Sequence, residues 1–173
     1  AVVSYNCEAE DVAAACCFAG TSLSEPHKST TVLAAIDKDL DMIAGWRYNY
    51  NRPELGVYWI DEVTAFRNLC EQLLKGDRSC DNIKGIDFIT QEVRDTYGIT
   101  SKRVKSIGDA TAKDLLKDCT TIDEMIARIC NVYLLSYGED TWKQELDFTG
   151  KLVYITKYTD VIFCVDKFIN GEL

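Results

Sequence analysis

The sequence predicts an α+β domain that is mainly helical, carries an antiparallel β-hairpin at its C-terminus and is stapled by disulfide bonds. Helical periodicity covers most of the chain, a C-terminal run is rich in β-branched and aromatic residues, and eight cysteines are dispersed between them. The 173 residues can bury a sizeable core, and no linker or repeat divides them. We therefore expect a single domain over residues 1–173, with an all-α domain as the alternative.

Apolar residues recur at helical spacing in five segments, and local signals mark where several of them begin and end. Asp87 and Asp109 are expected to cap two of these helices, and Gly98 is expected to end the first of the two. The clearest start is at Thr121, whose hydroxyl can pair with the backbone of Glu124 while that carboxylate pairs back. The five predicted helical segments are 30–45, 54–76, 85–98, 109–119 and 120–138.

The C-terminal run over residues 151–168 predicts two strands around a short turn at Thr159-Asp160, because β-branched and aromatic residues dominate it. An isolated hairpin is barely stable in water. The N-terminal residues 1–7 are therefore a candidate third strand, and a bond between Cys7 and Cys164 would fit that pairing.

The eight cysteines favour four disulfides over a metal site, since none forms C-x-x-C and the chain has one histidine. Disulfides persist outside the cytosol, so we expect a protein that is secreted or on the extracellular surface, with no metal and no cofactor. Adjacent Cys16 and Cys17 cannot easily bond each other. The predicted disulfide residues are Cys7, Cys16, Cys17, Cys70, Cys80, Cys119, Cys130 and Cys164.

The net charge of −9 argues against nucleic acid and anionic membranes as partners, because both attract clustered lysine and arginine. One short basic cluster, Lys102, Arg103 and Lys105, is interpreted as a solvated face. No apolar run reaches the roughly 20 residues that a membrane span needs. We expect neither a nucleic-acid partner nor a membrane span.

Few residues suggest catalysis, and we expect a protein that is not an enzyme. His27 is the sole histidine and lies in a polar stretch beside Pro26. The acidic run from Asp37 to Asp41 lacks the glycine and glutamate of a calcium loop. Neighbouring carboxylates such as Asp61 and Glu62 keep one alternative open, a hydrolase with a carboxylate-based site.

The segment from Trp46 to Trp59 is the most unusual stretch, because aromatic residues alternate with arginine and asparagine at strand-like spacing. Tryptophan, tyrosine and arginine dominate binding hot spots. The same aromatics could instead fill the core between two helices, and both interpretations stay open. The candidate contacts are Trp46, Arg47, Tyr48, Tyr50, Arg52 and Tyr58.

Lys75, Gly76 and Asp77 lie between Cys70 and Cys80, where they could form an exposed loop that a cell-surface receptor recognises. They also follow a strongly periodic helix, at whose end a lysine and a left-handed glycine are both favoured. The helix-end interpretation explains the lysine and the glycine without a receptor.

The function that these features predict is a secreted or cell-surface binding protein acting through protein–protein interaction, as an effector, surface antigen or receptor ligand does. Its partner would be an extracellular protein or receptor. The alternative is an extracellular carrier of a small apolar ligand, held between helices. The candidate walls of such a cavity are Met42, Phe66, Met125 and Tyr133.

Overall fold

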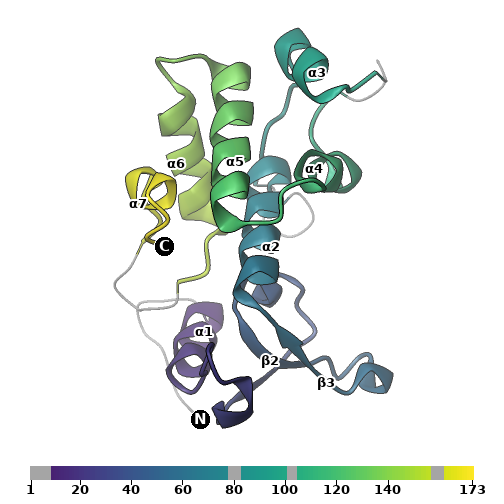
Figure 1. Cartoon of the computed structure of the whole chain (residues 1–173), viewed down its shortest axis with the longest axis vertical. Helices are drawn as coiled ribbons and strands as arrows, with labels where there is room; N and C mark the ends of the chain where they lie inside the picture. Colours follow the sequence, from purple (N-terminus) through teal and green to yellow (C-terminus); the bar gives the residue numbers. More distant parts are fainter. Residues whose placement is uncertain (1–8, 78–82, 101–104, 157–161) are drawn as a thin grey trace. The chain divides into compact units, whose positions relative to one another are not determined.

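The computed structural model describes residues 9–77, 83–100, 105–156 and 162–173 (Figure 1). The chain divides into two compact units, and the division falls inside one helix. Unit 1 comprises Ala1–Asn68 and Ile155–Ile162, and unit 2 comprises Leu69–Tyr154 and Phe163–Leu173. The described residues are mainly helical with one small sheet, so the predicted mainly helical α+β class is confirmed.

Unit 1 contains a three-stranded mixed sheet in the order β1-β2-β3. Strand β1 runs parallel to β2, and β2 runs antiparallel to β3. The chain turns from β2 to β3 through a short 3₁₀ segment that ends at Gly56, whose φ of 63° suits glycine. The elements are α1 (Ala9–Ala19), η1 (Pro26–Lys28), β1 (Val32–Ala34), η2 (Asp39–Met42), β2 (Gly45–Tyr48), η3 (Pro53–Leu55), β3 (Val57–Ile60) and the first part of α2 (Glu62–Lys75).

The helix predicted over residues 30–45 is wrong, because this segment forms β1 and the short 3₁₀ helix η2. Leu33, Leu40 and Ile43 do point inward, and Leu33 packs against a cluster formed by Ala14, Leu40 and Ile43. Their helical spacing arises from two separate elements that share one core. Pairing of β1 with β2 overrides the local pattern, as tertiary context often does.

Unit 2 is built around helix α5, whose predicted capping box is confirmed: Thr121 Oγ1 accepts from Glu124 N at 3.2 Å, and Glu124 Oε2 accepts from Thr121 N at 3.0 Å. The predicted end of helix α3 at Gly98 is also confirmed, with φ 66°. Its cap is Thr90 instead of Asp87, and the helix predicted over residues 109–119 is capped by Gly108 instead of Asp109. The elements are the end of α2, α3 (Gln91–Tyr97), α4 (Asp109–Leu116), α5 (Ile122–Tyr137), α6 (Trp142–Val153) and α7 (Val165–Ile169).

The predicted C-terminal hairpin is wrong, since helix α6 continues to Val153 and helix α7 begins at Val165. The ring of Phe163 packs against Phe168 at 5.7 Å between centroids, and both rings are buried in unit 2. These aromatic residues fill a helical core instead of pairing across strands. The expected turn at Thr159-Asp160 and the expected N-terminal strand over residues 1–7 lie outside the described residues.

The predicted disulfide framework is also wrong for the six cysteines that the structure describes, because no disulfide joins any two of them. Cys7 and Cys80 lie outside the described residues, and so does the proposed bond from Cys7 to Cys164. Cys17 is buried in unit 1, and its Sγ lies 3.6 Å from Arg47 Nη1. Buried cysteines here act as small apolar residues with a weakly polar sulfur.

Alkaline pH is expected to destabilise unit 2 through Tyr137. Burial, followed by the charges of Glu145 and Asp87, raises the pKa of Tyr137 to about 12 from 10.0. The folded state therefore holds this proton more tightly than the unfolded state does, and the stability it contributes is lost as pH rises from 10 towards 12. The unfolding free energy of wild type should fall relative to Tyr137→Phe over this range. Urea titrations at pH 9, 10, 11 and 12 would test this, and a constant difference would contradict it.

Candidate functional site

The exposed side of the unit 1 sheet is an aromatic and aliphatic surface. Trp46 lies opposite Val32 on β1 and Trp59 on β3, and Tyr48 lies opposite Ala34 and Val57. Residues two apart on a strand share a face. We call this surface the aromatic sheet face, and its residues are Val32, Ala34, Trp46, Tyr48, Val57 and Trp59.

None of these six residues is buried, and Val32 and Val57 are 50% and 53% exposed. The opposite row consists of Leu33, Arg47 and Tyr58, which face the core side of unit 1. One sheet face is thus packed and the other is open. An open sheet face is ordinarily polar, and this one is not.

The two tryptophans of the aromatic sheet face form an ordered pair. Their rings meet edge to face, with centroids 5.2 Å apart and planes at 70°. Trp46 Nε1 donates a hydrogen bond to the carbonyl oxygen of Pro26 at 3.0 Å, which attaches the ring to the η1 turn. A contact surface held in this way loses little side-chain entropy when a partner binds.

Arg47, a predicted contact, is a buried structural residue with 3% exposure. Its Nη2 donates to the carbonyl oxygens of Leu40, at 2.8 Å, and Ile43, and its Nη1 donates to the Trp46 carbonyl at 3.3 Å. Its Nε lies 3.8 Å from Asp41 Oδ1 and makes no hydrogen bond. Arg47 therefore ties η2 to β2 and is not available to a protein partner.

The remaining predicted contacts separate into different environments. Trp46 and Tyr48 lie on the aromatic sheet face, and Tyr50 and Arg52 are exposed in the turn between β2 and β3. Tyr58 is half-buried on the opposite row. The predicted contacts did not include four residues of the aromatic sheet face, Val32, Ala34, Val57 and Trp59. The strand-like alternation of the sequence could have placed Val57 and Trp59 on the same face.

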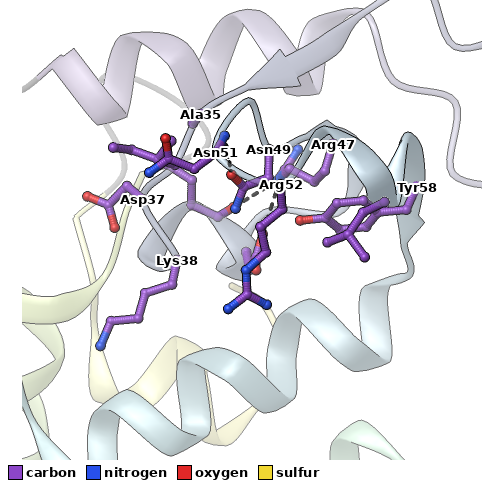
Figure 2. A pocket seen from close by; sticks show the side chains of 12 residues that line it. Ala35, Asp37, Lys38, Arg47, Asn49, Asn51, Arg52 and Tyr58 are labelled. Carbon is purple, nitrogen blue, oxygen red and sulfur yellow. Dashed lines mark hydrogen bonds and ion pairs between the residues drawn. The ribbon is translucent and has the colours of Figure 1, made fainter.

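A polar pocket of about 550 Å³ lies beside the hairpin that β2 and β3 form (Figure 2). Figure 2 shows Arg47, Arg52 and Tyr58 on one side of it, and Asp37 and Lys38 on the other. The residues that line it are Ala35, Ile36, Asp37, Lys38, Leu40, Asp41, Arg47, Asn49, Asn51, Arg52, Leu55 and Tyr58.

Two groups of this pocket titrate away from their ordinary ranges. Burial raises the pKa of Asp41; Arg47 opposes that rise and the charge of Asp37 adds to it. Burial and then the Asp41 carboxylate raise the pKa of the Tyr58 phenol, opposed by Arg47. Tyr58 therefore keeps its proton at neutral pH and can donate a hydrogen bond.

Lys75, Gly76 and Asp77 do not form the exposed loop that a receptor would need. Helix α2 ends at Lys75, and Gly76 adopts φ 68° while its N–H donates to the Gln72 carbonyl at 2.7 Å. Asp77 is only 7% exposed, and Lys75 pairs with Asp109 at 2.5 Å. The helix-end interpretation is confirmed by this geometry.

The structure gives no support to His27 as a site residue or to the predicted walls of a carrier cavity. His27 is exposed within η1, and no group of three or more metal-ligating side chains gathers among the described residues.

A second pocket of about 420 Å³ in unit 2 is lined by Tyr97, Asp118, Cys119, Glu124, Ala127, Arg128 and Asn131. Neither pocket is lined by the predicted carrier residues Met42, Phe66, Met125 or Tyr133.

No helix in the described part of the chain is long and apolar enough to cross a membrane. Comparison with protein-family models, curated proteins and solved structures found no match.

Proposed function

We propose that this protein is a non-enzymatic binding protein that recognises a partner protein through the aromatic sheet face of unit 1. The observation that supports this is that Trp46, Trp59 and Tyr48 lie side by side on one sheet face, each partly exposed. These residue types contribute most of the energy at protein interfaces. Contiguous apolar surface left in water costs free energy and is typical of interaction sites.

This proposal covers the interaction but not an extracellular location. The location was predicted from disulfide bonds, and no disulfide joins any two of the described cysteines. An extracellular protein or receptor as the partner likewise stays a prediction from the sequence. The partner would cover the tryptophan pair and the flanking valines Val32 and Val57.

The test begins with crosslinking, because the partner has to be identified first. A photoreactive phenylalanine placed at Val57 should capture one protein from the natural source. The same group at Phe148, an exposed aromatic position in unit 2, should not capture it. Capture from both positions, or from neither, would contradict the proposal.

Trp59→Ala should then weaken binding of the captured protein by about thirtyfold, because a central tryptophan truncation commonly costs 2 kcal/mol or more. Trp59→Phe should retain most of the affinity, and Phe148→Ala should retain all of it. Circular dichroism of each variant checks that the sheet is still folded. Equal affinity of Trp59→Ala and Phe148→Ala would remove the aromatic sheet face from the interface.

A further inference from the structure

We propose that the polar pocket of unit 1 binds a small organic anion, a carboxylate that carries an apolar body. This ligand site is separate from the aromatic sheet face, because Arg47 and Tyr58 of the pocket lie in the opposite row of the sheet. At about 550 Å³ the pocket has the size of a small-molecule site.

The first reason is a surplus of hydrogen-bond donors. The side chains of Lys38, Asn51, Arg52 and Tyr58 line the pocket and make no hydrogen bond or ion pair with the described part of the protein. An ammonium and a guanidinium can only donate, and the Tyr58 phenol stays protonated at neutral pH. A ligand that matches this set must supply acceptors, and a carboxylate supplies the strongest.

The second reason is local charge. Three cations line the pocket, Lys38, Arg47 and Arg52, against the two carboxylates of Asp37 and Asp41. Arg47 is buried and lies 3.8 Å from Asp41 Oδ1, so this carboxylate is largely offset. The pocket is therefore locally positive in a chain whose net charge is −9, and it would attract an anion.

The third reason is the apolar part of the lining. Ile36 and Leu55 are about half exposed where they line the pocket, and Ala35 and Leu40 add aliphatic surface. An inorganic anion would leave Ile36 and Leu55 in water. An organic body on the carboxylate would cover them, and the burial of that surface would add to affinity.

The experiment is calorimetric titration of the full chain with octanoate, beside 1-octanol and octylammonium, which share its chain but not its charge. Octanoate should bind the most tightly of the three. Arg52→Gln should weaken octanoate about tenfold, as loss of a charged hydrogen bond does. The matched control Lys113→Gln removes one exposed positive charge in unit 2 and should leave affinity within about twofold.

A variant of opposite sign makes the test sharper. Asp37 Oδ1 accepts from Asp39 N at 2.9 Å, and an asparagine can keep that bond while losing the charge. Asp37→Asn should therefore bind octanoate about threefold more tightly. The proposal is overturned if wild type does not bind octanoate, if octylammonium binds as well, or if Arg52→Gln matches Lys113→Gln. Trp59→Ala should bind octanoate normally, which separates this site from the protein interface.

Discussion

Gly76→Ala is expected to lower the free energy of unfolding of unit 2 by about 3 kcal/mol, the sum of a strained backbone and a steric clash. Gly76 ends helix α2 with φ 68°, a conformation that side chains with a Cβ rarely adopt. An added Cβ would also lie 2.3 Å from the Ile83 carbonyl oxygen and 2.4 Å from Gly85 N. These neighbours are backbone atoms, so they cannot rotate away as a side chain would.

The close approach around Gly76 is part of the hydrogen bonding of this region. Ile86 N donates to the Leu74 carbonyl at 2.9 Å, and Ile83 N donates to the Asp77 carbonyl at 2.6 Å. Relieving the clash means moving the segment that makes these bonds. Buried backbone groups that lose their partners cost stability in addition to the strain itself.

Gly98→Ala is the matched control, because Gly98 has φ 66° and ends helix α3, but an added Cβ there would meet none of the described residues within 4 Å. It should cost only about 1 kcal/mol, the strain without the clash. Urea denaturation followed by circular dichroism measures both. If the two variants lose equal stability, close packing at Gly76 is not the reason for its glycine.

The parts of the fold that could be predicted from sequence are those that local chemistry decides. The capping box of Thr121 and Glu124 needs only four residues, and it marks the start of α5. A glycine after a periodic helix ends α2 at Gly76 and α3 at Gly98, because left-handed φ is cheapest for glycine. In each case the interacting groups lie within a few residues of one another.

The sheet and the C-terminal region could not be predicted, because their partners are distant in the chain. Strand β1 is only three residues long, and it forms by pairing with β2, where Leu33 lies opposite Arg47. The β-branched and aromatic residues around Phe163 predict a strand, but Phe163 lies buried against Phe168 in a helical unit. Composition indicates which residues avoid water, but not which element they will meet.

For the candidate site, the sequence predicted the extended segment but not which of its faces is buried. Alternation from Trp46 onward indicated an extended segment, and β2 confirms it. Alternation does not say which of the two faces is buried, since a shift of one residue exchanges them. Burial of Arg47 rather than Trp46 depends on the carbonyl oxygens of Leu40 and Ile43, which no local pattern reveals.

Arg47→Met is expected to lower the unfolding free energy of unit 1 by about 3 kcal/mol, because it removes the donors to these carbonyl oxygens. Methionine fills a similar volume but cannot donate to the carbonyls of Leu40, Ile43 and Trp46. It also leaves Asp41 without its cation. Arg47→Lys should restore little of this stability, because one ammonium cannot reproduce the planar spread of guanidinium donors.

Arg52→Met is the control on the same hairpin, since Arg52 is exposed and its side chain makes no hydrogen bond or ion pair with the described residues. Its stability should stay within about 0.5 kcal/mol of wild type in the same denaturation experiment, while its affinity for octanoate falls. Arg47→Met should lose stability and, because Trp46 is next to it on β2, weaken the protein interface as well. If Arg47→Met were as stable as Arg52→Met, Arg47 would not be the residue that holds η2 to the sheet, and the order of the aromatic sheet face would need another origin.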